Sequence, residues 1–270
     1  MKIHLITGAA SGIGFELART LLQRGDTVVA CDLNIQPMEE LRAHATERNH
    51  LQLQQLDVRD AAQWEAAVQS TSNYGRIDTV MNVAGVMRVN LIDTVPDSDI
   101  DLMLDVNTKG TILGTQAAYR VMRRQKDDRG RGHIINIASL AGVAPIPGAA
   151  LYTASKFAVR GYSLAVAQEL KPYGIALTVI CPDAVSTPMV APYVATPEAA
   201  VIFSGARLLT IQEVVDAIVN RAMVKRPIEI TLPRSRATLA KIASAWPGLA
   251  GRLAATMTRR GLRNQAGGKR

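Results

Sequence analysis

Cysteine and histidine are scarce in this chain of 270 residues, which contains two cysteines and four histidines. Cys31 and Cys181 each end an apolar run, where buried reduced thiols are common, and two cysteines do not form a disulfide scaffold. The histidines are scattered and lack metal-ligand spacing, at His4, His44, His50 and His133. We therefore expect no metal site, and the cysteine usage favours a reducing cytoplasm.

Long apolar runs are also absent. No stretch reaches the roughly 18 uninterrupted apolar residues of a membrane span. The apolar run between Lys2 and Thr7 is too short for the core of a signal peptide, and we interpret it as a first strand. Internal repeats and low-complexity segments are missing. With 48% hydrophobic and 20% charged residues, the composition is that of a globular protein with a substantial core, which excludes disorder of the whole chain.

The formal net charge of +8 is unevenly distributed. Residues 221–270 hold 12 Lys and Arg against one acid, Glu229, whereas the preceding 220 residues hold 19 bases and 22 acids. The basic character is therefore a property of the C-terminal segment and not of the main body.

Short β-type runs alternate with amphipathic helical stretches up to about residue 232. The expected strands are Ile3–Ile6, Thr27–Cys31, Leu51–Leu56, Thr79–Met81, His133–Ala138, Ala176–Ile180 and Ile228–Thr231. The expected helices are Gly14–Arg24, Met38–Glu47, Ala61–Ser70, Asn107–Arg124, Tyr152–Leu170 and Ile211–Met223. This alternation predicts an α/β fold with one doubly wound parallel sheet. We expect a catalytic domain over residues 1–232, followed by a helical extension over 233–270. Proline-rich Pro182–Pro197 is expected to form a loop or short helix over the carboxyl edge of the sheet, where active sites of such folds lie.

A glycine-rich turn follows the first expected strand and opens a helix. Its sequence is Thr7-Gly8-Ala9-Ala10-Ser11-Gly12-Ile13-Gly14. Glycines at these places allow a tight turn and close approach of the backbone to a pyrophosphate, while the helix N-terminus attracts its charge. The position at the start of a βαβ unit, followed by a second strand that ends in Asp32, predicts a dinucleotide site.

Asp32 selects among dinucleotides. Its carboxylate is placed to accept hydrogen bonds from the adenosine ribose hydroxyls, and its sequence neighbours include no Arg or Lys that would offset its charge. A 2′-phosphate would meet this carboxylate at a cost of several kcal/mol. We therefore expect NAD(H) and not NADP(H).

Two further strand ends complete the expected cofactor site. Asp57, in Leu56-Asp57-Val58, is placed to accept from the adenine amino group. The small residues of Asn82-Val83-Ala84-Gly85 would let the backbone pass beneath the cofactor.

Four residues predict acid/base chemistry beside that site. Tyr152 and Lys156 are four residues apart and share one helix face. A free phenol titrates near pH 10, so an adjacent ammonium and an oxidised nicotinamide ring should lower the pKa of Tyr152 towards neutrality. Ser139, at the end of the fifth strand, is placed to donate to the substrate oxygen, and Asn107 to anchor a water that passes protons to Lys156.

In these motifs the sequence resembles the short-chain dehydrogenase/reductase family over about residues 2–231. The resemblance implies a seven-stranded Rossmann sheet, a tetrad of Asn107, Ser139, Tyr152 and Lys156, and hydride transfer at nicotinamide C4. It also implies that Lys156 binds the nicotinamide ribose and that the helices Asn107–Arg124 and Tyr152–Leu170 form a homodimer or homotetramer. The expected cofactor-binding set is Gly8, Ser11, Gly12, Ile13, Gly14, Asp32, Asp57, Val58, Asn82, Ala84, Gly85, Tyr152, Lys156, Pro182, Val185 and Thr187.

Two positions depart from the family pattern. Val83 replaces the second Asn of the usual Asn-Asn-Ala-Gly, which leaves the glycine turn intact. Asp183 replaces the glycine of the usual Pro-Gly after the sixth strand, and adds a carboxylate near the nicotinamide end. Val185 and Thr187 still match the positions that hold the nicotinamide carboxamide in the family.

The C-terminal segment carries an amphipathic pattern that is interrupted at Pro247-Gly248. Its apolar stripe consists of Leu239, Ile242, Trp246, Leu249, Leu253 and Met257. Three interpretations compete: packing on the body or across a subunit interface, peripheral contact of residues 234–263 with an anionic membrane, and nucleic-acid binding. The membrane reading suits the Trp and the cationic flank and would imply a lipophilic substrate. Nucleic-acid binding has the least support, since no recognition motif is present.

The leading functional hypothesis is an NAD(H)-dependent oxidoreductase acting on a lipophilic secondary alcohol or ketone. The alternatives are an NAD(H)-binding regulatory or scaffold protein without turnover, and epimerisation or dehydration on the same scaffold. Retention of Tyr152, Lys156, Ser139 and Asn107 argues against the regulatory alternative.

Overall fold

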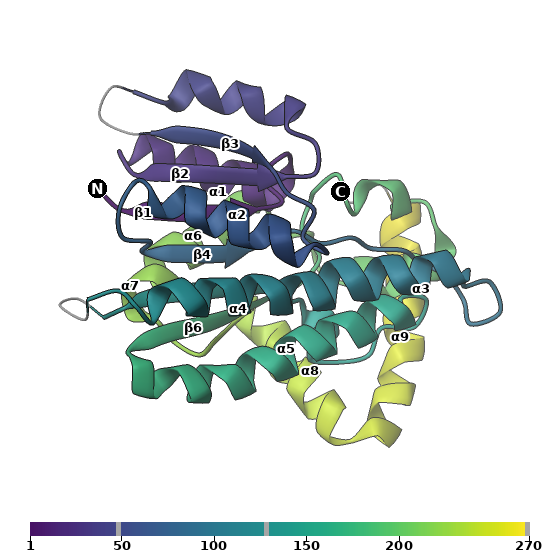
Figure 1. Cartoon of the computed structure of the whole chain (residues 1–270). Helices are drawn as coiled ribbons and strands as arrows, with labels where there is room; N and C mark the ends of the chain where they lie inside the picture. The colour runs from purple at the N-terminus through teal and green to yellow at the C-terminus, as the bar shows by residue number, and fades with distance from the viewer. Residues whose placement is uncertain (47–49, 127–129, 268–270) are drawn as a thin grey trace.

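A single parallel sheet of seven strands forms the centre of the molecule (Figure 1). The computed structural model describes residues 1–46, 50–126 and 130–267, without the side chains of residues 247, 249, 250, 252 and 253. The strand order is β3-β2-β1-β4-β5-β6-β7, with every neighbouring pair parallel. The strands are β1 (Ile3–Thr7), β2 (Thr27–Asp32), β3 (Leu51–Gln55), β4 (Thr79–Asn82), β5 (Gly132–Ile137), β6 (Ile175–Pro182) and β7 (Glu229–Leu232). The predicted doubly wound sheet is confirmed.

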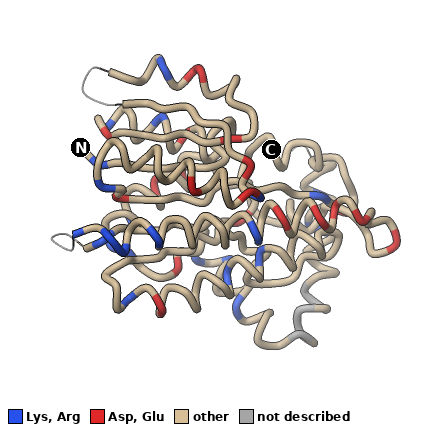
Figure 2. Tube along the Cα trace, in the orientation of Figure 1, with Lys and Arg blue, Asp and Glu red and all other residues tan. Residues whose placement is uncertain are grey.

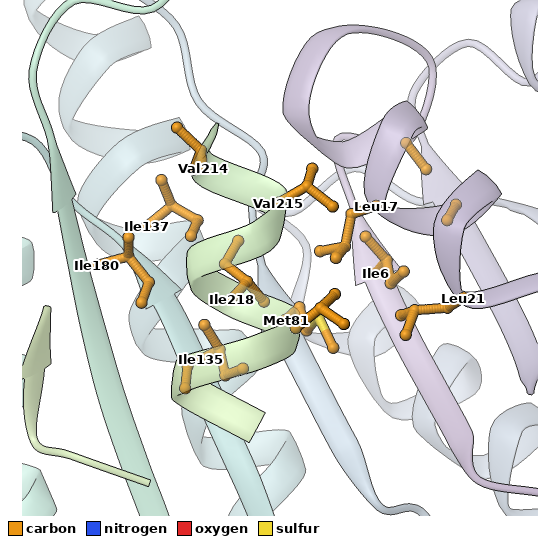
Figure 3. Packing of buried hydrophobic residues seen from close by; sticks show 14 of the residues in the cluster. Ile6, Leu17, Leu21, Met81, Ile135, Ile137, Ile180, Val214, Val215 and Ile218 are labelled. Carbon is orange, nitrogen blue, oxygen red and sulfur yellow. The ribbon is translucent and has the colours of Figure 1, made fainter. Parts of the chain in front are cut away.

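Helices cover both faces of the sheet. One face carries α1 (Gly12–Gln23) and α6 (Ile211–Ala217), and the other carries α2 (Ala61–Ser72), α4 (Gly110–Met122) and α5 (Ala150–Leu170). Successive strand residues point to opposite faces. In β1, Ile6 therefore packs among α1 and α6 side chains, as Figure 3 shows, while Leu5 joins Trp64 and Met122 on the other face.

Two helical regions differ from the sequence-based expectation. The stretch predicted as an α-helix over Met38–Glu47 is a 3-10 helix, η1 (Gln36–His44), and Glu47 lies outside the described residues. An ion pair between Glu39 and Arg42 fits this tighter coil, in which side chains three apart are stacked. The helix predicted to begin at Asn107 is preceded without a break by α3 (Asp97–Met103) and a π-helical turn, η2 (Leu104–Lys109).

Short helices connect the remaining elements. They are η3 (Leu140–Gly142), η4 (Lys171–Tyr173), η5 (Ala191–Tyr193), η6 (Pro197–Phe203), η7 (Ile218–Ala222) and α7 (Met223–Lys225). The proline-rich stretch after β6 thus consists of loop and short helices, as predicted. Acidic residues follow one another along α3 (Figure 2).

The C-terminal segment folds into two helices, α8 (Arg234–Ala245) and α9 (Pro247–Ala266). They lie at the side of the molecule towards which the strands point (Figure 1). The break falls at Trp246, beside the predicted Pro247-Gly248 interruption, and the side chains of Leu249 and Leu253 lie outside the described part. Among the helices in the described ranges, none combines the length and hydropathy needed to cross a bilayer.

Candidate active site

A cavity of about 540 Å³ opens at the carboxyl ends of the strands. It lies where β1 pairs with both β2 and β4, so that the crossovers before and after this point run in opposite directions along the sheet. Ligands of open α/β sheets bind at such a switch point. The cavity collects residues from the ends of β1, β2, β4, β5 and β6, and also from α8 and α9.

The glycine turn forms one wall of the cavity, and its backbone requires glycine. Gly8 and Gly12 have φ angles of +70° and +56°, and a Cβ on Gly8 would lie 2.8 Å from the backbone of Ala84. Ser11 caps α1 in an extended conformation without a side-chain capping hydrogen bond, so the first amides of α1 remain available for a phosphate. This cradle fits the pyrophosphate of a dinucleotide.

Gly14 permits the close approach of α1 to β1. A Cβ at this position would overlap the Gly8 carbonyl oxygen. We expect Gly14→Ala to displace α1, to lower the melting temperature and to weaken dinucleotide binding at least tenfold, measured by calorimetric titration. Gly161→Ala in α5 is the matched control, since its Cβ would meet nothing within 4 Å. The control should be neutral or stabilising by about 0.5–1 kcal/mol, and equal effects of both substitutions would contradict this role of Gly14.

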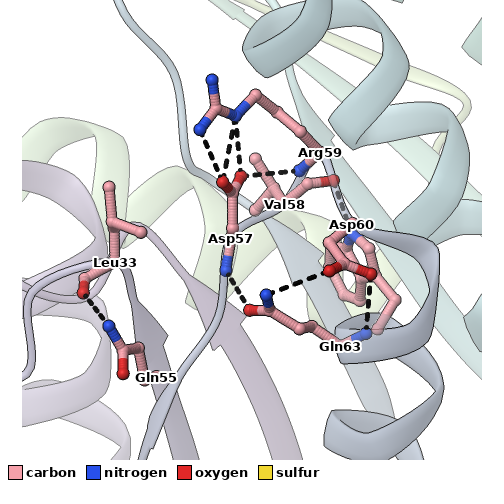
Figure 4. Close-up of polar contacts among 8 residues, drawn as sticks. Leu33, Gln55, Asp57, Val58, Arg59, Asp60 and Gln63 are labelled. Atoms are coloured by element: carbon pink, nitrogen blue, oxygen red, sulfur yellow. Dashed lines mark hydrogen bonds and ion pairs between the residues drawn. The ribbon is translucent and has the colours of Figure 1, made fainter.

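Two acidic residues lie at the end of the cavity formed by β2 and β3. The Asp32 carboxylate accepts from the backbone N–H of Ala10 at 3.0 Å and of Asn34 at 3.3 Å. The Asp57 carboxylate is held by the Arg59 guanidinium at 2.6–3.1 Å (Figure 4). This pairing lowers the pKa of Asp57. Arg59 also lines the cavity. A cation thus lies near the expected adenosine end, although none is among the sequence neighbours of Asp32.

Three of the four predicted catalytic side chains meet at the other end of the cavity. Ser139, Tyr152 and Lys156 all line it. Ser139 is hydrogen-bonded to Tyr152, and its Oγ accepts from the Ala141 N–H at 3.0 Å. The Lys156 ammonium donates to the Ile137 carbonyl at 3.1 Å and lies 5.7 Å from the centroid of the Tyr152 ring.

Burial shifts the pKa values of this pair in opposite directions. Burial raises the pKa of Tyr152 to about 12, although the Ser139 hydrogen bond opposes the change. Burial also lowers the pKa of Lys156 to about 8. In the chain by itself, desolvation of the phenolate outweighs the Ser139 hydrogen bond. The expected lowering of the Tyr152 pKa includes the charge of an oxidised nicotinamide ring and stays a prediction.

Asn107 and Asn82 lie behind the cavity wall and not among its lining residues. The π-helical turn η2 places the Asn107 amide against Val86, whose N–H it accepts at 2.8 Å and to whose carbonyl it donates at 2.9 Å. A Cβ on Gly85 would lie 3.2 Å from Asn107 Oδ1 and 3.4 Å from Lys156 Nζ, so both groups flank this glycine. The Asn82 amide donates to Asn136 at 2.8 Å. Of the predicted cofactor set, Asn82 thus supports a neighbouring strand, whereas the other members line the cavity.

Asp183 does not present a free carboxylate to the nicotinamide end. It pairs with Arg236 of α8 at 2.5 Å, and its backbone N–H donates to the Leu232 carbonyl at 2.7 Å. Burial raises the pKa of Asp183, and the Arg236 charge opposes this effect. The loop that follows keeps its expected place, since Val185 bridges to Leu209 and a Cβ on Gly12 would lie 3.5 Å from Thr187.

The fold and cavity define a dinucleotide-binding α/β protein, and comparison with known proteins gives its family. The model of the short chain dehydrogenase family matches residues 2–198. The chain is 31% identical over 213 residues to a cyclopentanol dehydrogenase of Comamonas testosteroni, covering 77% of this chain and 82% of that protein. It is 37% identical over 190 residues to a 3-alpha-(or 20-beta)-hydroxysteroid dehydrogenase of Mycobacterium tuberculosis, covering 70% of each. The crystal structure of levodione reductase superposes with a TM-score of 0.76 at 26% identity, covering 88% of this chain and 98% of that one.

The chain therefore belongs to the short-chain dehydrogenase family, which confirms the resemblance seen in its sequence motifs. Its members are oxidoreductases that transfer a hydride with a nicotinamide cofactor. The family match ends at residue 198, before α8 and α9. The residues of the cavity wall that these helices supply are thus outside the matched region, and the family motifs gave no signal for them.

Proposed function

We propose that this protein is an NAD(H)-dependent oxidoreductase that interconverts an uncharged, lipophilic secondary alcohol and its ketone. The proposal rests on the meeting of Ser139, Tyr152 and Lys156 in one cavity with the glycine turn of a dinucleotide site. Relatives that by name act on a cyclic alcohol and on hydroxysteroids support this class of substrate.

In the proposed reaction Tyr152 is the general acid/base. The nicotinamide ring, when bound, accepts or supplies the hydride at C4, and its oxidised form adds a positive charge to the site. During oxidation Tyr152 takes the hydroxyl proton in its phenolate form, while the carbinol carbon gives up its hydrogen as the hydride. Ser139 donates to the substrate oxygen and holds it beside Tyr152. Lys156 binds the nicotinamide ribose, and Asn107 keeps the adjacent backbone at Gly85 and Val86 in place.

A screen of lipophilic alcohols with NAD, followed by absorbance at 340 nm, tests this activity. The expected result is reduction of NAD with uncharged secondary alcohols. Failure with every alcohol and with both NAD and NADP would contradict the proposal.

Asp32 is the residue proposed to select NAD over NADP, because its carboxylate would repel a 2′-phosphate. Asp57 holds Arg59, so this cation is already engaged. We expect Asp32→Ser to lower the ratio of kcat/KM for NAD to that for NADP by about 10- to 100-fold, which corresponds to about 1.4–3 kcal/mol. Exposed Glu40 provides the control, and Glu40→Ser should leave the ratio unchanged. An unchanged ratio in Asp32→Ser would show that another group determines the preference for NAD over NADP.

The proposal includes a homodimer or homotetramer formed through α4 and α5, as is common in the family, in a reducing cytoplasm that suits the buried free thiols of Cys31 and Cys181. It does not include the membrane contact considered for the C-terminal segment. Several of the residues that this contact would use, among them Leu239 and Met257, line the cavity.

A further inference from the structure

The C-terminal helices form part of the wall of the candidate active site. Leu239, Ala240 and Ala243 of α8 and Ala254 and Met257 of α9 line the cavity that also contains Tyr152. All five side chains are apolar. The same cavity is lined by further apolar side chains from the body, including Met87, Ile146 and Val190.

Helix α9 is fixed to the body by specific contacts. The Asn264 amide donates to the carbonyls of Phe203 and Gly205 at 2.8 and 2.9 Å, and the Gln265 amide donates to that of Thr196 at 2.9 Å. Gly261 lies so close to η6 that a Cβ would overlap the backbone of Ala200. These contacts place α9 directly on the segment that follows the proline-rich loop.

Helix α8 is fixed by ion pairs. Arg236 contacts Asp183 at 2.5 Å and donates to the Ser204 hydroxyl at 3.2 Å, so one side chain joins α8, the end of β6 and the end of η6. Lys241 pairs with Glu229 of β7 at 2.5 Å. The Arg236–Asp183 pair is mostly buried, with side-chain exposures of 26% and 13%. Basic residues of the C-terminal segment thus serve contacts within the chain.

At the end where the alcohol would react, the polar groups of the cavity are mainly Ser139, Tyr152 and Lys156, and the proposed function commits the Lys156 ammonium to the nicotinamide ribose. Asp183 and Arg236 also line the cavity, but they neutralise each other. A charged substrate would lose its hydration in this apolar space without gaining a partner, which is costly. An apolar skeleton of several carbon atoms would instead gain burial.

We propose that α8 and α9 are the specificity wall of this enzyme and that Arg236, clamped between Asp183 and Ser204, is the positioning residue that holds the wall against the active site. Resting on the proposed function, this assigns the substrate as a secondary alcohol or ketone on a bulky, uncharged, polycyclic-sized skeleton. Small alcohols leave the wall without contacts, and charged alcohols are excluded by it.

Filling the cavity from α9 tests the wall. Wild type should oxidise decahydronaphthol with a higher kcat/KM than cyclohexanol, and lactate not measurably. Met257→Trp should lower the ratio of kcat/KM for decahydronaphthol to that for cyclohexanol by about tenfold or more, since misfit in an apolar pocket costs about 1–3 kcal/mol. Thr256→Trp, exposed on the same helix, is the matched control and should change neither value. Equal losses of kcat/KM for both alcohols in Met257→Trp, or a wild-type preference for lactate, would contradict the proposed specificity wall.

Removing the clamp tests the positioning role. Arg236→Met should raise KM for decahydronaphthol about tenfold with a much smaller change in kcat, and should hasten proteolysis within α8 and α9. Exposed Arg234→Met on the same helix should do neither. Arg236→Lys should restore part of the affinity, because an ammonium keeps the charge but not the forked geometry. A fall in kcat without a change in KM would overturn the positioning role.

The two proposals fail in different ways. If the wild type oxidises none of the alcohols with either dinucleotide, both the proposed function and the proposed specificity wall are refuted. If the wild type turns over decahydronaphthol and Met257→Trp retains the full selectivity, only the wall is refuted.

Discussion

Tyr152→Phe is expected to lower kcat by about 10²- to 10⁴-fold, the usual contribution of a positioned general acid/base. The substitution removes one hydroxyl and keeps the ring that lies 5.7 Å from Lys156. Dinucleotide affinity, measured by calorimetric titration, should therefore change little. Burial raises the pKa of Tyr152 to about 12, so the oxidation rate of the wild type should rise with pH as this phenol is deprotonated. The folded variant, saturated with NAD and alcohol, should lack this rise.

Tyr162→Phe is the control for this experiment. Tyr162 belongs to the same helix, α5, but its hydroxyl is hydrogen-bonded to Thr115 of α4 and it is not among the cavity-lining residues. This variant should keep wild-type turnover. A Tyr152→Phe enzyme that turns over substrate at the wild-type rate would show that another group moves the proton.

Much of the fold could be predicted because its determinants are local. The alternation of apolar strands with amphipathic helices identified all seven strands of the sheet to within one or two residues. Burial on both faces leaves continuous apolar runs in strands such as β1 and β2. The prediction of an α-helix after Met38 is wrong because the apolar residues of this stretch are compatible with either an α-helix or a 3-10 helix. The onset of α3 at Asp97 was missed because the acidic residues of Asp97–Met103 obscure an apolar face.

Those parts of the site whose contacts arise within one short sequence motif could be predicted. Gly8, Gly12 and Gly14 are recognisable because their conformations and clearances exclude side chains. Asn82 was assigned to the cofactor from its position in a motif, but its amide contacts Asn136 across the sheet. Contacts between distant segments have no such signature. Arg59 against Asp57 and Arg236 against Asp183 arise from tertiary packing, and nothing in either sequence neighbourhood indicates them.

The electrostatics of the acid/base pair was the least predictable feature. Spacing alone places Lys156 one helical turn from Tyr152, but it does not give the burial of either group. Lys156 is 4% exposed, and its ammonium donates to the Ile137 carbonyl at 3.1 Å. Desolvation therefore lowers its pKa from 10.5 to about 8. The buried cation destabilises the folded chain, so the site has a cost in stability that the sequence motif does not reveal.

Lys156→Met is accordingly expected to abolish most turnover and to stabilise the fold at pH 7. The lowered pKa corresponds to about 3 kcal/mol, and the lost hydrogen bond to the Ile137 carbonyl offsets about 1 kcal/mol. The net gain of about 2 kcal/mol should raise the melting temperature by about 4–8 °C. Exposed Lys171→Met is the control and should leave both activity and melting temperature nearly unchanged.

The pH dependence of this stability difference identifies its origin. Below pH 8 the ammonium of Lys156 is charged in both the folded and the unfolded chain, so the full penalty of burying it is present. As the pH rises from about 8 towards 10.5, the folded wild type loses this proton while the unfolded chain keeps it, and the penalty disappears. The advantage of Lys156→Met should therefore shrink over this interval, as measured by urea unfolding at a series of pH values. An advantage that stayed constant with pH would assign it to packing of the methionine, and a destabilised variant at pH 7 would show that the chain does not penalise this charge.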